Sequence, residues 1–446
     1  MYLSETNSRT KSHLNISNVE PRFGATKLAA GAPHIRAFCE CAGLCAIRSI
    51  LILAVLSALL LIAALPAQAK VKETMLYDFC SIQGDNSCYD GTWPAAGLTS
   101  DGAGNFYGMT EEGGAFGYGE VFELSPNGSG GWNETVLYSF TGGADGGFTY
   151  YSDVIFDSVG NLYGTTTTGG ANGLGVVFEL SPVGASWTET VLYSFAGGAD
   201  GAYPFVGVRM DPAGNLYGTT FGSNFGTPTV FELSPSGGGW TKQVIYSVAT
   251  SQYAALKMDA AGNIFGVGYS TAFELSPNGN GGWNPTVIHT FTGSPKDGSD
   301  PNGTPVLDQA GNLYGTTSEG GTDDEGTVYK LSPGRKGKWT ERILHSFKGE
   351  TKDGGYPFGG IVFDAAGNIY GTTAGGGNYG GNQGTVFKLV APVGRGSYRE
   401  KVLWNFTQTD GGYPYCSLIL DSAGNLYGTT YYGGATGSGV VFEVTP

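Results

Sequence analysis

Histidine is scarce in this 446-residue chain, which has four in all. Only His289 and His345 lie after residue 70, and each stands where related segments carry a tyrosine, as at Tyr138, Tyr193 and Tyr246. We therefore interpret both histidines as framework substitutions. The sequence offers little support for a histidine-ligated metal or for a Ser-His-Asp triad.

Basic residues are also few. The chain has 23 Lys and Arg against 38 Asp and Glu, and residues 70–446 alone carry 17 and 35, a formal net charge of −18 for that part. Because such a surface repels phosphates, no nucleic acid and no anionic membrane surface is expected as a partner. The charge suits a soluble exported protein, or one that meets cations.

Three of the six cysteines precede residue 70, at Cys39, Cys41 and Cys45. Cys80 and Cys88 are candidates for a disulfide, which suits an oxidising compartment and would contribute roughly 2.6 kcal/mol for a loop of about nine residues. Cys416 is either free or competes for Cys88. No segment with helical periodicity is visible after residue 70.

Residues 1–69 form a leader whose apolar run, residues 50–65, follows Arg48 and ends in the small-residue sequence PAQA before Lys70. We interpret the leader as a secretory signal. The alternative is an uncleaved anchor, although a full membrane span needs about 20 residues. The protein is therefore expected to be exported, to an extracellular, periplasmic or cell-surface location, and to touch a membrane only through this segment if it stays uncleaved.

After residue 70 one unit is repeated seven times. Its Asp-x-x-Gly-Asn signature begins at a marker aspartate, at steps of 48 to 57 residues: Asp101, Asp157, Asp211, Asp259, Asp308, Asp364 and Asp421. A period near 50 residues, built from strand-like segments, is typical of propeller blades. The 77 glycines recur at fixed places in the units, which indicates turns and not disorder.

Each unit holds four short β-type runs, which we name strands A to D in chain order. In the second unit they are residues 153–157, 162–166, 176–180 and 188–195, each followed by a turn signal. Such a sheet is apolar on both faces, so it must pack against copies of itself.

The first and last units are incomplete in complementary ways. The chain ends in strand C, at residues 440–446, and no strand D follows. Residues 71–79 (VKETMLYDF) align with the strand D sequence WTETVLYSF and precede the first strand A. We therefore predict an all-β fold over residues 70–446: a seven-bladed β-propeller of four-stranded blades, in which strand 71–79 completes the C-terminal blade and leaves no open edge.

The Asp-x-x-Gly-Asn turns invite a calcium interpretation, because carboxylate and amide oxygens are its ligands. A structural role explains them better. The aspartate of a tight hairpin accepts the backbone N–H groups of the turn, and glycine supplies the positive φ. Since every unit has the turn, we predict no cofactor, with calcium as the alternative.

The strand order places the B–C and D–A loops on one face, which carries aromatic and acidic residues. The candidate ligand contacts on it are Tyr118, Tyr151, Tyr203, Tyr356, Tyr413 and Tyr432. Rings and carboxylates around a concave mouth suit a polysaccharide and a protein ligand equally well. The alternative is that these tyrosines only brace the glycine-rich loops.

The fourth unit departs from the repeat. Its B–C loop shrinks to residues 268–270 and the loop before it to residues 249–253, which predicts a notch in the rim. Beside it, Arg209 and Lys257 occupy an inner-strand position that is apolar in four other units, as Ile155, Val306, Val362 and Ile419. They either pair with carboxylates such as Asp153 or meet an anionic ligand. No pair of carboxylates stands out for glycoside hydrolysis, so no catalytic residue is predicted.

The pattern GNLYGTTxxGGxxxxGxVFELSP, at residues 161–182 and 312–333, resembles the GloVer tandem repeats of bacterial secreted "choice-of-anchor" proteins over nearly all of residues 70–446. Its Asp-x-x-Gly-Asn-Leu-Tyr part is also similar to the NHL class of propeller repeat. The resemblance implies export and a repeat architecture, and no settled activity. The chain stops at Pro446 without a C-terminal sorting helix, so the resemblance does not extend to cell-wall or membrane attachment.

We therefore expect an exported, non-catalytic binding or interaction module at the cell envelope or outside it, for carbohydrate or protein. The alternative is a carbohydrate-active or lactone-active propeller enzyme whose site is the central mouth.

Overall fold

The computed structural model describes residues 70–84, 87–222, 226–247, 256–268, 270–349, 353–377, 382–394 and 396–446. The leader expected at residues 1–69 lies outside them. Within the described ranges, no helix is long and apolar enough to cross a membrane.

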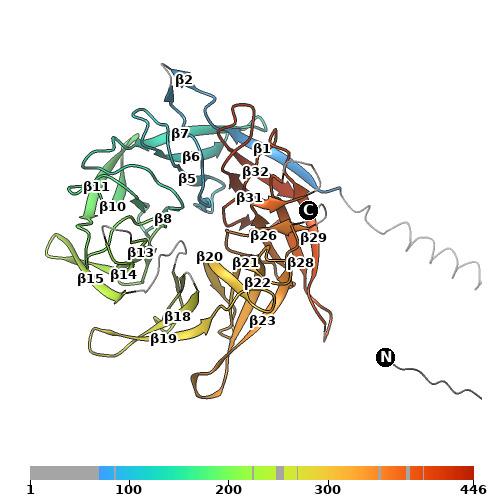
Figure 1. Ribbon diagram of the computed structural model, residues 1–446. Coiled ribbons are helices and arrows are strands. Elements are labelled where there is room, and N and C mark those ends of the chain that lie inside the picture. The colour runs from blue at the N-terminus through green and yellow to red at the C-terminus, as the bar shows by residue number, and fades with distance from the viewer. Residues whose placement is uncertain are drawn as a thin grey trace, which may run out of the picture. The chain divides into compact units, whose positions relative to one another are not determined.

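Residues Lys70–Pro446 form one compact unit of seven four-stranded antiparallel sheets, arranged as blades around a common axis (Figure 1). The predicted seven-bladed β-propeller is confirmed. The first four blades are β4 (Thr99–Ser100), β5 (Phe106–Thr110), β6 (Glu120–Pro126) and β7 (Trp132–Ser139); β8 (Ile155–Phe156), β9 (Leu162–Thr166), β10 (Val176–Val183) and β11 (Ser186–Ser194); β12 (Arg209–Met210), β13 (Leu216–Thr220), β14 (Thr229–Ser236) and β15 (Gly239–Ser247); β16 (Lys257–Met258), β17 (Ile264–Gly268), β18 (Thr271–Pro277) and β19 (Trp283–Thr290).

The last three blades are β20 (Gly298–Leu307), β21 (Leu313–Gly320), β22 (Thr327–Pro333) and β23 (Trp339–Ser346); β25 (Val362–Phe363), β26 (Ile369–Thr373), β28 (Thr385–Val390) and β29 (Arg399–Asn405); β30 (Ile419–Leu420), β31 (Leu426–Thr430) and β32 (Val440–Thr445) with β1 (Lys72–Asp78). Two small ribbons pair β2 (Gln83–Gly84) with β3 (Ser87–Cys88) and β24 (Gly354–Gly355) with β27 (Gly375–Gly376). The described residues include no α-helix and a single 3-10 turn, Arg335–Gly337.

The closing strand lies where the sequence predicts it. β1 pairs antiparallel with β32, with Met75 opposite Phe442. The backbone N–H of Phe79 donates to Gly439 O at 3.1 Å, and the Phe79 ring is fully buried. The C-terminal blade therefore takes its outer strand from the start of the unit, and it has four strands like the other six blades.

The core lies between neighbouring blades and repeats around the ring. Phe140, at the end of one strand D, packs edge to face on Phe178 of the next strand C, with 5.1 Å between ring centroids. A Cβ on Gly164 would lie 2.6 Å from the Phe178 ring, so strand B needs glycine there. Burying each such phenylalanine stabilises the fold by about 1.5–3 kcal/mol.

The Asp-x-x-Gly-Asn turns use their carboxylates internally. Asp157 Oδ1 accepts the N–H groups of Val159 and Asn161, both at 2.9 Å, and Oδ2 accepts Asn161 Nδ2 at 2.9 Å and the Tyr163 hydroxyl at 3.2 Å. Burial acts to raise the pKa of Asp157, but these hydrogen bonds outweigh it and lower the pKa below its usual value. With both oxygens bonded within the turn, the geometry supports the structural role.

Cys80 and Cys88 form the predicted disulfide, and Cys416 is free and buried. In the fourth blade, Gly268 of β17 pairs directly with Thr271 of β18, so the B–C connection is as short as the sequence predicts. Residues 249–253 and 269 lie outside the described ranges. The notch in the rim therefore stays a prediction.

Candidate functional site

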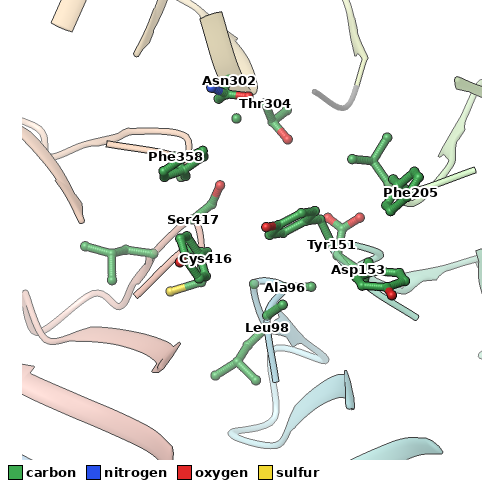
Figure 2. Close-up of a pocket in the computed structure, with 18 residues that line it drawn as sticks. Ala96, Leu98, Tyr151, Asp153, Phe205, Asn302, Thr304, Phe358, Cys416 and Ser417 are labelled. Carbon is green, nitrogen blue, oxygen red and sulfur yellow. The ribbon is translucent and has the colours of Figure 1, made fainter. Parts of the chain in front are cut away.

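A pocket of about 390 Å³ lies at the centre of the ring (Figure 2). Among the described residues, six of the seven blades line the pocket. The lining residues are 95–98, 150–151, 153, 205–206, 302–304, 358–359 and 415–418. Almost all of these residues directly precede the inner strand of a blade. The pocket therefore lies toward the face that carries the B–C and D–A loops.

One repeat position supplies a pocket residue from six blades, and in the fourth blade this position lies outside the described residues. It lies six residues before the marker aspartate, and we call it the minus-six position: Ala95, Tyr151, Phe205, Asn302, Phe358 and Tyr415. Four of the six are aromatic. Tyr415 contacts Tyr151 and Phe358 edge to face, with centroids 6.0 Å and 5.2 Å away. Rings from blades far apart in sequence thus share one wall.

The minus-four position, two residues further along, carries the polar groups. It is Asp153, Thr304 or Ser417 in three blades and glycine at Gly97, Gly207 and Gly360. The Ser417 hydroxyl accepts the Gly360 N–H at 2.8 Å. Among the described residues, only three blades therefore have a hydroxyl or carboxylate group at the minus-four position. The Asp-x-x-Gly-Asn turn, in contrast, is present in every blade.

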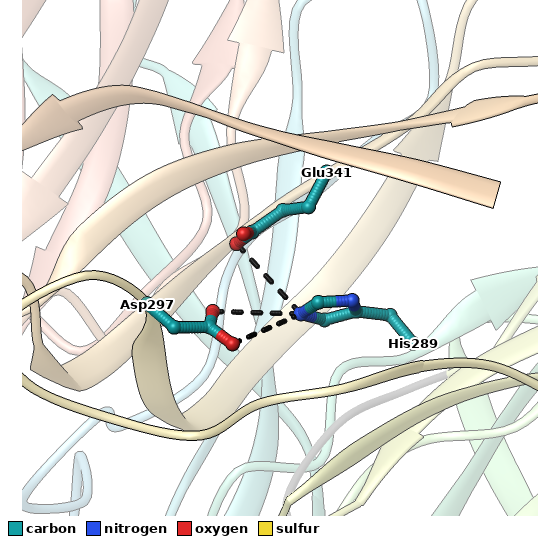
Figure 3. Close-up of side chains that lie close together, drawn as sticks. All are labelled: His289, Asp297 and Glu341. Atoms are coloured by element: carbon teal, nitrogen blue, oxygen red, sulfur yellow. Dashed lines mark hydrogen bonds and ion pairs between the residues drawn. The ribbon is translucent and has the colours of Figure 1, made fainter.

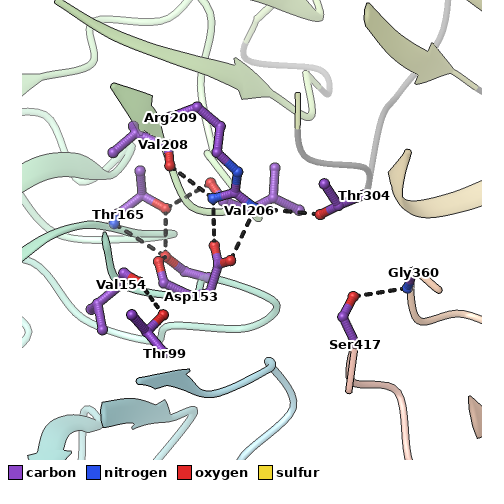
Figure 4. A network of polar contacts seen from close by, with 11 residues as sticks. Thr99, Asp153, Val154, Thr165, Val206, Val208, Arg209, Thr304, Gly360 and Ser417 are labelled. Atoms are coloured by element: carbon purple, nitrogen blue, oxygen red, sulfur yellow. Dashed lines mark hydrogen bonds and ion pairs between the residues drawn. The ribbon is translucent and has the colours of Figure 1, made fainter. Parts of the chain in front are cut away.

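Arg209 links two of these polar groups (Figure 4). Its Nη1 and Nη2 donate to Asp153 Oδ1 and Oδ2 at 3.0 Å and 2.9 Å, and Nη2 also donates to Thr304 Oγ1 at 3.3 Å. The two charged side chains are 21% and 27% exposed. Arg209 thus pairs with Asp153, one of the two alternatives that the sequence leaves open, and neutralises the carboxylate beside the pocket.

Lys257, the second predicted cation, is exposed and does not line the pocket. Of the six tyrosines predicted as ligand contacts, only Tyr151 is in the lining. Tyr118 packs edge to face on Phe148, and Tyr432 on Tyr431. Both are about two-fifths exposed on the rim.

Tyr203, Tyr356 and Tyr413 each precede a proline and have φ of 56°, 55° and 53°. Their N–H groups donate across the blade junction, to Leu174 O at 2.9 Å in the first case. Their carbonyls accept from the B–C loop of their own blade, as Tyr203 O does from Phe221 N at 3.0 Å. The backbone of these three residues therefore connects the loops of neighbouring blades.

Sequence reasoning missed Phe358, Asn302 and Thr304 as pocket residues. The signal is a fixed distance from the marker aspartate, six residues for Phe358 and Asn302 and four for Thr304, because it brings the same positions of each blade to the axis. It also missed Glu111, which stands where other units have threonine, phenylalanine, serine, alanine or tyrosine. Glu111 is buried and accepts the Tyr431 hydroxyl at 2.7 Å.

The pocket offers little acid–base or nucleophilic chemistry among its described residues. Asp153 is held by Arg209. Burial raises the pKa of the Cys416 thiol to about 11, so it stays protonated and unreactive at neutral pH. Burial, then Tyr413 and Tyr432, raise the pKa of Tyr415, which keeps its phenol a neutral hydrogen-bond donor. The described lining of the pocket therefore consists mainly of ring faces and neutral polar groups.

The model of the Gloeobacter/Verrucomicrobia repeat matches residues 69–272 and 266–446. The chain belongs to this family. A comparison of this repeat protein with curated proteins finds no match.

Solved structures with a similar fold include virginiamycin B lyase from Staphylococcus aureus, at 12% identity and a TM-score of 0.51, covering 84% of this chain and 99% of the lyase. A catalytically inactive variant of the same lyase with quinupristin gives the same identity and score, covering 84% and 100%. A 6-phosphogluconolactonase-like protein from Bacteroides uniformis is 14% identical, with a TM-score of 0.47 and coverages of 78% and 99%. At these identities the likeness shows the fold alone.

Proposed function

We propose that the propeller of this Gloeobacter/Verrucomicrobia repeat protein is a non-catalytic binding module that takes a carbohydrate into its central pocket. The observation that carries this proposal is the pair of repeat positions at the axis. The minus-six position supplies aromatic rings, and the minus-four position supplies hydroxyl groups and a neutralised carboxylate.

This combination matches the two surfaces of a sugar. The C–H face of a pyranose is apolar and packs on an aromatic ring, while its hydroxyl groups need donors and acceptors at the edge. A volume of about 390 Å³ is near the lower end of the usual ligand pockets of about 300–1,000 Å³, so one or two sugar rings fit. Because Arg209 neutralises Asp153, the pocket favours an uncharged saccharide.

We also propose that the module works outside the cytoplasm, at the cell envelope or beyond it. The Cys80–Cys88 disulfide supports this location, because disulfides persist in oxidising compartments. The secretory pattern of the leader supports it as well.

A glycan array followed by titration calorimetry on the full chain tests the proposal. Replacing Tyr151 or Phe358 by alanine removes a ring of the pocket wall and is expected to weaken binding of the selected saccharide at least tenfold. Tyr118→Ala is the matched control, since this tyrosine is exposed on the rim and outside the lining. Its affinity should stay unchanged.

The opposite pattern would overturn the pocket as the site: an effect of Tyr118→Ala with none of Tyr151→Ala places binding on the rim, as for a protein ligand. If the protein converted the bound saccharide, or a lactone supplied in its place, into a product, the proposal of a non-catalytic module would be wrong and the protein would be an enzyme.

A further inference from the structure

Each described blade junction repeats a small polar cluster. It combines a strand D side chain, the aspartate of the following D–A loop, and a strand D residue of the next blade. The six described copies are Tyr77–Asp90–Glu134, Tyr138–Asp145–Glu189, Tyr193–Asp200–Lys242, His289–Asp297–Glu341, His345–Asp353–Glu400 and Trp404–Asp410–Glu73. Two of them contain histidine.

The histidine clusters bring three metal-ligating groups to one point (Figure 3). His289 Nε2 lies 3.2 Å and 3.4 Å from the two oxygens of Asp297 and 3.9 Å from Glu341 Oε1. Zinc bonds of about 2.0–2.1 Å at tetrahedral angles place neighbouring ligand atoms about 3.3 Å apart. The cluster already has nearly this spacing.

The second copy has the same geometry one blade further. His345 Nε2 lies 3.3 Å from Asp353 Oδ1, and in each trio the ligand atoms lie within 4.8 Å of one another. The ligands come from consecutive blades: β19 and β23 in the first cluster, and β23 and β29 in the second. An ion held there would tie neighbouring blades together.

Both clusters place a glutamate close to a buried aspartate, and a proton or a cation must compensate the two acidic groups. Glu341 Oε1 and Glu400 Oε1 are buried and accept no hydrogen bond from the described residues. Asp297 is only 6% exposed and Asp353 only 8%. Burying carboxylates is costly unless a cation or a donor compensates them.

The other junctions serve as internal comparisons. In the tyrosine clusters the phenol donates to the aspartate at 2.8–3.0 Å, which is shorter than the histidine contacts. Their glutamates are unpartnered too, but a neutral phenol is a poor metal ligand. At the third junction Lys242 replaces the glutamate and places its ammonium 2.7 Å from Asp200 Oδ1. This position therefore accepts a cation beside the loop aspartate.

We propose that His289, Asp297 and Glu341 bind one divalent ion of the zinc class, and that His345, Asp353 and Glu400 bind a second. Imidazole with two carboxylates suits this class of metal, and water completes the coordination. Each ion replaces a proton or a weak contact by three bonds between neighbouring blades. The two sites are separate from the central pocket and do not depend on the proposed saccharide.

Zinc binding by the full chain tests the proposal, with the protein first stripped by a chelator. His289→Tyr and His345→Tyr restore the residue of the other blades, so both variants are expected to fold. Titration calorimetry should show that the wild type binds two more equivalents of Zn²⁺ than the double variant, and that each single variant loses one equivalent. Counting by difference removes any contribution of the leader.

Tyr138→His provides the reciprocal test, because it completes a third trio with Asp145 and Glu189. This variant should bind one more equivalent than the wild type, whereas Tyr138→Phe should bind the same number. Co²⁺ in place of Zn²⁺ should give the visible absorption of a four-coordinate ion, with an intensity that follows the same counts. Equal zinc binding by the wild type and the double variant would overturn the proposal and leave each histidine as a hydrogen-bond bridge between two carboxylates.

Discussion

The Asp-x-x-Gly-Asn turns and the central pocket are built from the same seven repeats. The turns stay the same from blade to blade, whereas the pocket residues differ. The Asp-x-x-Gly-Asn turn keeps its hydrogen bonds from blade to blade, as at Asp157, Asp308 and Asp421. The minus-six and minus-four positions hold different types of residue in different blades. Repetition therefore identifies the scaffold, and departure from the repeat identifies the places where this chain has its own chemistry.

The largest expected effect on the free energy of unfolding is at the repeated core between the blades. Phe79→Ala removes a fully buried ring from the junction that closes the propeller, where it packs on Phe122 at 5.1 Å. We expect a loss of about 3–5 kcal/mol in the free energy of unfolding, measured by chemical denaturation. Phe116→Ala, at a loop residue that is 59% exposed, is the control and should cost less than about 0.5 kcal/mol. Equal losses would mean that the closing blade is not packed like the others.

A smaller effect on the free energy of unfolding is expected for the ion pair beside the central pocket. Arg209→Ala leaves Asp153 without its two-pronged partner, and we expect a loss of about 1–3 kcal/mol, below that of a fully buried pair because both side chains are partly exposed. Asp153→Ala in the same background should then cost little. The double-mutant cycle measures this coupling, and additive losses would show that the pair contributes nothing to stability.

The smallest expected effect on the free energy of unfolding is that of replacing Glu120. This glutamate lies in a strand of the repeated framework but departs from the repeat. Glu120 is fully buried where other blades have valine or threonine, and both its oxygens lack a hydrogen bond from the described residues. Burial, then Glu134 and Asp90, raise its pKa well above the usual value. The folded state thus keeps a proton that the unfolded chain loses near pH 4.3.

The stability that this proton provides is fully present below pH 4.3 and is lost as the pH rises toward the folded pKa. Glu120→Thr should therefore stabilise the protein more at pH 8 than at pH 5, by about 1–2 kcal/mol in denaturant titrations. Glu123→Thr, at a less buried glutamate of the same strand, is the control. The same gain at both pH values would contradict a protonated Glu120.

The sequence alone predicts the ring, its closure and the disulfide, because each rests on a local pattern. The match between residues 71–79 and other copies of strand D is one such pattern, confirmed by the pairing of Met75 with Phe442. The pocket and the junction clusters escape such reasoning. Tyr151 and Tyr415 meet only because the ring brings segments from distant blades to one axis.

The histidines illustrate the same limit. Register along strand D correctly places His289 at the tyrosine position, since it pairs with Ala272 as Tyr138 pairs with Val121. It says nothing about Glu341, which arrives from the following blade. In the sequence, His289 looks like a simple replacement of tyrosine. In the folded protein it lies beside the carboxylates of Asp297 and Glu341.

The pairing of β1 with β32 also orders events during biosynthesis. The first strand of the propeller to be made finds its partner only when the last is complete, so the ring cannot close on a growing chain. Until then two strand edges stay available to other polypeptides, and a chain cut short before Val440 would keep them so. Folding of the ring is therefore expected to finish only after the whole chain has been made.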